Sequence, residues 1–127
     1  MADRLRIGSI VTALFPEHHP GAHEQEGYRP AVVVGLPLLA GRPRFESVIV
    51  VPFTTDHSQE WALRSPRLYP RFPVGIAGLR SPSICLLDQA RALSIERMHR
   101  LRGWLNEAEY EPVRDGLRLV FGEHVKN

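Results

Sequence analysis

The sequence is short of cysteine and of long apolar runs, and each shortage excludes a class of protein. Cys85 is the single cysteine among 127 residues, which excludes an internal disulfide framework and a cysteine-based zinc site. No run approaches the roughly 20 apolar residues that cross a bilayer, and no secretory signal is visible at the start. A free cysteine without a signal peptide predicts a protein of the reducing cytoplasm, with no membrane partner.

Lysine is almost absent as well, so nearly all positive charge is arginine. Sixteen basic residues face 14 acidic ones, for a net charge of +2, and Lys126 is the only lysine. This balance excludes a histone-like polycation. Genome base composition is one explanation of the arginine excess, and bidentate phosphate binding by guanidinium groups is another. With 43% hydrophobic and 24% charged residues, the composition predicts one globular domain over residues 1–127.

The prolines divide the chain into two parts. Ten of the eleven lie between Pro16 and Pro82, which predicts strands and loops first and helix in the last third. This segregation indicates an α+β, mainly β fold. Short β-branched apolar runs predict strands over 7–15, 30–37, 47–53 and 83–88 continued by 90–93, with a weaker edge strand over 61–68. Polar segments rich in proline and glycine predict loops over 16–26, 40–44 and 71–81.

Three further sequence signals concern local backbone structure. Pro52 cannot donate to a sheet ladder, which predicts an edge or a bulge at that end of its strand. Ser94 predicts the start of a short helix that ends near Gly103, with Met98 and Leu101 packed inward. The basic residues of 97–102 then form either its solvated face or a nucleic-acid patch.

The terminal helix has a clear beginning and end in the sequence. Asn106 and Glu109 make a capping-box pattern. Pro112 removes one backbone hydrogen bond, which predicts either a kink or a later start near Glu111. Gly122 predicts the stop. The expected architecture is a strongly curved antiparallel sheet with one C-terminal helix.

Three polar segments carry groups that can act on a phosphate or a proton. Residues 23–30 combine an imidazole, a carboxylate and a guanidinium, which suits acid–base work beside an anion clamp. Residues 51–56 place two threonines and an aspartate at the exit of a buried strand, and residues 87–91 place polar groups within an apolar strand. The structural alternatives are a solvated loop, local bonding of Thr and Asp to backbone, and a strand end marked by a salt bridge.

Other chemistries find little support. His18 and His19 are adjacent on an extended segment and point in opposite directions, so a metal site with His23 is disfavoured. The chain has no phosphate-binding loop, dinucleotide fingerprint or nucleophile elbow. Cys85 lies in an apolar strand and is predicted to be an inert core residue.

The order of the motifs resembles the MazF/PemK (Kid) family of toxin endoribonucleases. A Gly-Ser-Ile-Val strand precedes His-Glu-Gln-x-Gly-x-Arg-Pro-Ala-Val-Val-Val, and Val-Val-Pro-Phe-Thr-Thr, Leu-Leu-Asp-Gln-Ala-Arg-Ala-Leu and the terminal helix follow. The similarity runs from about Gly8 to Gly122, and Glu-Gln-x-Gly-x-Arg-Pro is its most specific part.

The resemblance implies a fold, an activity and partners. The fold is an SH3-like barrel or curved sheet with a terminal helix, of the CcdB/MazF kind. The activity is metal-independent cleavage of single-stranded RNA, in which the 2′-hydroxyl attacks the phosphorus and leaves 2′,3′-cyclic phosphate and 5′-hydroxyl ends. The partners are a second copy of the chain and a cognate antitoxin, with no cofactor.

The resemblance also assigns roles to residues. The catalytic candidates are Arg29, Thr54, Glu24 and His23, and either His23 or Glu24 is the general base. The substrate-binding candidates are Gln25, Thr55, Asp88, Gln89 and Arg91.

Departures from the family pattern keep alternatives open. Leu86 stands where the Kid-like branch has an arginine two residues before the aspartate, so that part of the site is incomplete unless Arg91 or Arg80 replaces it. Ser9 replaces an acidic residue, and Pro112 is unusual in the terminal helix. The alternative function is a non-catalytic toxin or module on the same fold, either a gyrase binder like CcdB or a degenerate RNA- or antitoxin-binding protein.

Overall fold

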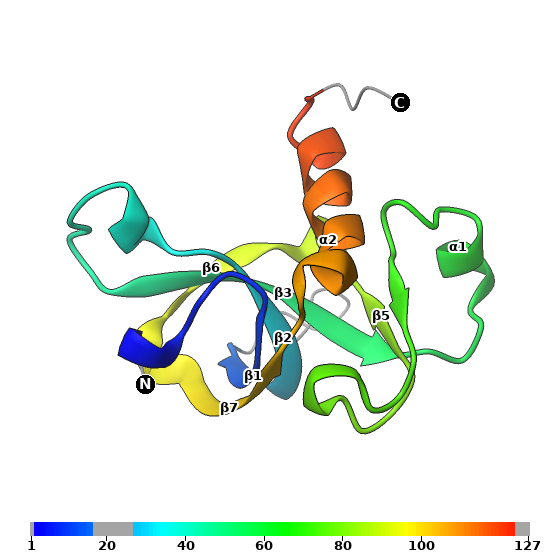
Figure 1. Cartoon of the computed structure of the whole chain (residues 1–127), viewed down its shortest axis with the longest axis horizontal. Helices are drawn as coiled ribbons and strands as arrows, with labels where there is room; N and C mark the ends of the chain where they lie inside the picture. Colours follow the sequence, from blue (N-terminus) through cyan, green and yellow to red (C-terminus); the bar gives the residue numbers. More distant parts are fainter. Residues whose placement is uncertain (1, 17–26, 124–127) are drawn as a thin grey trace.

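The structure, a computed structural model, describes residues 2–16 and 27–123 and is built around one antiparallel sheet (Figure 1). Neighbouring strands follow the order β4-β5-β3-β2-β1-β7, and β6 also pairs with β3. The curved sheet and the C-terminal helix confirm the predicted fold class. In the described part of the chain β4 and β7 do not pair, so the sheet is open and not a closed barrel. The strands are β1 (Ser9–Phe15), β2 (Gly27–Gly35), β3 (Ser47–Thr55), β4 (Arg71–Phe72), β5 (Ser83–Cys85), β6 (Arg91–Ser94) and β7 (Met98–Trp104).

The central strands are buried on both faces, which explains their unbroken apolar sequences. Successive residues point to opposite sides of a strand, so Val32 joins the core beneath the terminal helix and Val33 joins the core on the other face. Val51 and Val50 divide in the same way. The sheet therefore lies between two apolar clusters.

The terminal helix α2 (Glu107–Val120) begins where the capping pattern predicts. The Asn106 side chain accepts from the Glu109 N–H and the Glu109 carboxylate accepts from the Asn106 N–H, each at 2.8 Å. Pro112 lies inside the helix, so the later start near Glu111 is wrong, and the kink stays a prediction. Gly122 ends the helix with a φ of +85°, as predicted.

Helix α2 packs close to the chain beneath it at Gly116. A Cβ on Gly116 would lie 2.2 Å from Leu87 Cδ1 and 2.6 Å from the Arg67 carbonyl oxygen. Leu87 belongs to the short 3-10 turn Leu87–Gln89. The absence of a side chain at Gly116 therefore sets how closely the helix approaches this turn.

Two predicted elements are wrong. The segment 61–68 contains helix α1 (Glu60–Leu63) and turns, not an edge strand; Ala62 is buried and Trp61 packs edge-on against Tyr69. The predicted helix up to Gly103 is a 3-10 turn, Ile95–Arg97, followed by β7. Pairing with β1 makes β7 a strand, and Met98 and Leu101 still pack inward, as predicted.

The predicted strand over 83–93 is two strands, because β3 changes its neighbour along its length. Strand β6 pairs with Ser47–Val50 and β5 with Phe53–Thr55. Pro52 lies in the interval, pairs with Ala31 of β2, and its carbonyl accepts from the Leu86 N–H at 3.0 Å. The predicted edge or bulge at Pro52 is wrong: the missing N–H faces a gap between two partner strands, where no ladder bond is lost.

Candidate functional site

A cavity of about 200 Å³ is lined by two of the predicted catalytic residues, Arg29 and Thr54. Arg29 comes from the beginning of β2, and Thr54 and Thr55 come from the end of β3. The ladder between these strands ends at the pair Ala31 and Pro52, and Arg29 and Thr54 each lie two residues beyond that pair on neighbouring strands. The cavity, called here the Arg29 pocket, is lined by Arg29, Pro30, Phe53, Thr54, Thr55, Leu79, Arg80, Ser81, Ser83 and Arg102.

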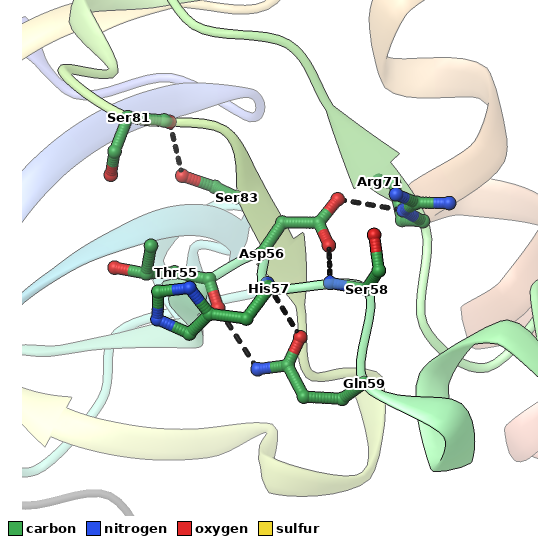
Figure 2. Close-up of polar contacts among 8 residues, drawn as sticks. All are labelled: Thr55, Asp56, His57, Ser58, Gln59, Arg71, Ser81 and Ser83. Carbon is green, nitrogen blue, oxygen red and sulfur yellow. Dashed lines mark hydrogen bonds and ion pairs between the residues drawn. The ribbon is translucent and has the colours of Figure 1, made fainter.

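The turn that follows β3 holds the threonine end of this pocket in place. Figure 2 shows the Asp56 carboxylate accepting from the Ser58 N–H at 2.8 Å and from Arg71 Nε at 2.7 Å. Gln59 accepts from the His57 N–H at 2.7 Å and donates to the Thr55 carbonyl at 3.0 Å. These bonds confirm local backbone bonding by Asp56 at the strand exit, and they tie Thr55 to the turn.

The Asp56 carboxyl has a pKa below its usual range. The hydrogen bond from Arg71 is the main cause, and the bond from the Ser58 N–H adds to it. Its side chain is 8% exposed. The carboxylate therefore stays charged at neutral pH and links β4 to the end of β3. On the neighbouring strand, the Ser83 hydroxyl donates to the Ser81 carbonyl at 2.8 Å (Figure 2).

Two arginines in the pocket escaped the sequence prediction of the catalytic set. The sequence suggests Arg80 only as a substitute partner for Asp88, and Arg102 belongs to the segment predicted as helix. Arg102 is fixed by three bonds: Nε and Nη2 donate to the Gly78 carbonyl at 3.2 and 2.9 Å, and Nη1 donates to Thr12 Oγ1 at 3.1 Å. Burial lowers the pKa of Arg102, and the charges of Arg80 and Arg100 lower it further.

The remaining described candidates lie around a different hollow. Asp88, Gln89 and Arg91 line a cavity of about 360 Å³ that shares no lining residue with the Arg29 pocket. Asp88 accepts from the Tyr69 hydroxyl at 2.7 Å. Burial, and then this bond, raises the pKa of Tyr69 to about 12. Within one chain, these candidates and Arg29 therefore line separate hollows.

The Leu86 departure also has a structural explanation. Leu86 is 5% exposed and packs with Ala62 and Ile84 in a small apolar cluster. This position belongs to the interior and lines neither of the two hollows. The Arg29 pocket instead holds Arg80 and Arg102 beside Arg29.

His18, His19, His23, Glu24 and Gln25 lie outside the described residues. In the described ranges, no group of three His, Cys, Asp or Glu side chains is placed to hold a metal ion. No helix in those ranges has the length and apolar character to span a membrane. Cys85 is a buried core residue as predicted, and burial raises the pKa of its thiol.

Solved structures with the same fold place this geometry in context. The Mycobacterium tuberculosis toxin MazF-mt6 is 17% identical, with a TM-score of 0.66 over 92% of this chain and 99% of that one. MazF from Deinococcus radiodurans is 20% identical, with a TM-score of 0.69 over 93% and 96%. A mycobacterial endoribonuclease in complex with its cognate antitoxin is 14% identical, with a TM-score of 0.62 over 94% and 95%.

The family comparison covers most of the sequence. No curated protein matches the chain. The model of the PemK-like, MazF-like toxins of type II toxin–antitoxin systems matches residues 6–121, a range that contains the whole sheet, the Arg29 pocket and α2. The chain therefore belongs to the PemK-like, MazF-like toxin family of type II toxin–antitoxin systems.

Proposed function

We propose that this protein is a cytoplasmic toxin that cleaves single-stranded RNA in the Arg29 pocket. The observation that carries the proposal is the convergence of Arg29 with Thr54 and Thr55 in one cavity, within a chain of the MazF-like family. A guanidinium beside hydroxyl donors suits a phosphodiester, because planar guanidinium groups match phosphate oxygens and stay protonated. The three arginines lining the cavity make it attractive to a polyanion.

In the proposed reaction the ribose 2′-oxygen attacks the adjacent phosphorus and the bond from phosphorus to the 5′-oxygen breaks. The 2′-hydroxyl proton passes to a general base, His23 or Glu24, and the leaving 5′-oxygen takes up a proton. The products are a 2′,3′-cyclic phosphate and a 5′-hydroxyl. Arg29 stabilises the extra negative charge of the phosphorane, and the Thr54 hydroxyl donates to a non-bridging oxygen.

The test is cleavage of an RNA oligonucleotide in EDTA, because the proposed chemistry needs no metal ion. One 2′-deoxy substitution at the scissile nucleotide is expected to stop cleavage by removing the nucleophile. Arg29→Ala and Thr54→Val are each expected to lower kcat by about 10²–10³, the usual loss when one transition-state donor is removed. Arg42→Ala is the control, because Arg42 is exposed and lies outside the pocket. Normal cleavage by both pocket variants would refute the assignment.

The partners belong to the same proposal. We expect a homodimer and inhibition by an acidic antitoxin segment laid over the Arg29 pocket, since carboxylates compete for an anion site. Gln25, Thr55, Asp88, Gln89 and Arg91 stay the proposed substrate contacts. Sedimentation measures the dimer, and co-expression with an acidic reading frame next to the gene measures inhibition. A chain that cuts no RNA but captures gyrase would favour the non-catalytic alternative.

A further inference from the structure

A further hollow, distinct from the one lined by Asp88, adjoins the Arg29 pocket. It has a volume of about 230 Å³ and is lined by Gly78, Arg80, Arg100 and Arg102. Arg80 and Arg102 line both hollows. Among the residues that the structure describes, no carboxylate forms an ion pair with any of these three arginines. Within residues 2–16 and 27–123, the fold therefore gathers three like charges beside the pocket with no carboxylate ion-paired to them.

The backbone holds this cluster in a defined shape. Gly75, Ala77 and Gly78 have φ values of +95°, +50° and +81°, and Ala77 is strained because it carries a side chain. Contact with β7 maintains the strain: a Cβ on Gly103 would lie 2.9 Å from the Ala77 carbonyl oxygen. Arg102 then grips the Gly78 carbonyl with two N–H groups. The strained loop at Ala77 and Gly78 thus packs against β7 and holds Arg102 of the arginine cluster in position.

Arg102 retains capacity for a ligand in this arrangement. A guanidinium has five N–H donors, and the contacts to Gly78 and Thr12 use three of them. The remaining two are available at a group whose position is already determined. Arg80 and Arg100 are exposed, so their forks can close on the same anion from the solvent side.

An exposed aromatic pair neighbours these arginines in the sequence, and neither ring lines the two hollows themselves. Tyr28 precedes Arg29 on β2, and His99 precedes Arg100 on β7. Their ring centroids are 5.3 Å apart with an interplanar angle of 62°, and Tyr28 is 61% exposed. Exposed rings beside cationic groups stack on nucleic-acid bases whatever their sequence.

We propose that Arg80, Arg100 and Arg102 form a second phosphate subsite, which holds a phosphate neighbouring the scissile one while Tyr28 and His99 stack on a base of the same strand. This proposal rests on the proposed function, because it assigns single-stranded RNA to both sites. The aromatic pair favours RNA over an acidic peptide, since a carboxylate-rich segment gains nothing from a stacking surface.

The test measures binding of a fully 2′-O-methyl RNA oligonucleotide, which cannot be cleaved, by fluorescence anisotropy over a range of salt concentrations. Arg100→Gln is the test variant, because the Arg100 side chain is exposed and forms no ion pair or hydrogen bond with the residues that the structure describes, while its backbone pairing with Thr12 is kept. Arg42→Gln makes the same charge change in the segment between β2 and β3, which lies at the far left of Figure 1, and Arg42 does not line this hollow. Circular dichroism checks that both variants are folded.

Loss of one phosphate contact is expected to change two measured quantities, the affinity for RNA and its salt dependence. Arg100→Gln weakens RNA binding about 5- to 10-fold and reduces the slope of log Kd against log salt by about 0.7, the value for one single-strand phosphate. Arg42→Gln changes both far less. A methylphosphonate at the contacted phosphate removes the difference between wild type and Arg100→Gln.

The outcomes separate this proposal from the proposed function. If Arg29→Ala abolishes cleavage while Arg100→Gln binds RNA like Arg42→Gln, the second subsite is refuted and the nuclease stands. If wild type cuts no RNA but Arg100→Gln still shows the selective loss of affinity, the subsite is supported and the nuclease is refuted. If Arg100→Gln weakens binding of a glutamate-rich peptide and leaves RNA binding unchanged, the surface binds protein and the proposal is wrong.

Discussion

The ion pair between Asp56 and Arg71 ties the turn after β3 to β4, so Asp56→Asn tests whether this link supports the pocket. In the wild type, one carboxylate oxygen accepts from Arg71 Nε at 2.7 Å and the other from the Ser58 N–H at 2.8 Å. Asparagine keeps an oxygen for the Ser58 N–H and replaces the other with an amide nitrogen. The variant therefore removes the ion pair and retains the turn.

The size of the effect follows from exposure. The Asp56 side chain is 8% exposed, but that of Arg71 is 43% exposed, so water screens the pair. A charge-assisted hydrogen bond contributes about 1.5–3 kcal/mol when shielded, whereas an exposed ion pair contributes about 0.2–1 kcal/mol. We expect Asp56→Asn to lower the free energy of unfolding by about 1 kcal/mol at pH 7, which lowers Tm by about 4 °C in a domain of this size.

The pH dependence gives a second readout. The folded state lowers the pKa of Asp56 from its ordinary value of 3.8, mainly through the Arg71 bond. The stabilisation is therefore fully present above pH 3.8 and is lost as pH falls through the lower folded pKa. Thermal unfolding at pH 7, 5 and 3 is expected to show a Tm difference between wild type and variant that narrows only at the most acidic pH.

Asp115→Asn is the matched control. Asp115 lies 4.0 Å from Arg118, and their side chains are 37% and 50% exposed, so the expected loss is below about 0.5 kcal/mol. We also expect Asp56→Asn, and not Asp115→Asn, to slow RNA cleavage several-fold, because Thr54 and Thr55 precede the loosened turn. Equal stability losses in the two variants, or a Tm difference that does not change with pH, would refute the reasoning.

Three further predictions concern packing and titration. Gly116→Ala is expected to lower the free energy of unfolding, measured by denaturant titration, by about 1–3 kcal/mol through overpacking against Leu87 and Arg67. This loss is expected although alanine is a better helix former than glycine. Gly41→Ala is the control, because a Cβ at Gly41 would have nothing within 4 Å. Cys85 is 0% exposed and its thiol pKa is raised by burial, so a thiol reagent is expected to label it only at the rate of unfolding, and fast labelling of the native protein would contradict the burial. Tyr69→Phe is expected to cost about 0.5–1.5 kcal/mol by removing the bond to Asp88. The folded state raises the pKa of Tyr69 to about 12, so this stabilisation persists below pH 10 and is lost as pH rises through 12. An absorbance titration of the tyrosine hydroxyls in Tyr69→Phe is expected to lack one of the groups that ionise near pH 12.

Two kinds of element could be predicted from the sequence: those with a short local signal, and strands that are buried on both faces. Strands β1, β2 and β3 read clearly because both of their faces are apolar. The capping box of Asn106 and Glu109 is complete within four residues. The sequence pattern does not predict β7, because the register of this strand against β1 shifts between Ile10 and Val11 and again between Thr12 and Ala13. These shifts break the two-residue alternation, and Met98 and Leu101 then have the spacing of a helix face.

The residues of the site likewise divide into those that the sequence predicts and those that depend on the three-dimensional fold. The proximity of Arg29 and Thr54 follows from two adjacent strands, and the family resemblance named both residues. The proximity of Arg80 and Arg102 depends on a loop in left-handed conformation at Ala77, for which no local sequence signal exists. Asp88 lies in the 3-10 turn Leu87–Gln89, which interrupts the strand predicted over 83–93, and it lines a different hollow from Arg29.

The small net charge of the chain conceals a local cluster of positive charge. Arg80, Arg100 and Arg102 gather around one hollow, whereas Glu111 and Asp115 of α2 line another together with Arg67. Like charges and a strained alanine at the same place oppose folding, and Arg102 offsets part of this cost through its three hydrogen bonds. Such a cluster is expected where binding, and not stability, determines the sequence. The arginine excess is thus distributed background at most positions, and the arginines at the edge formed by β7 and the loop that precedes β5 are the surface that we propose binds an anion.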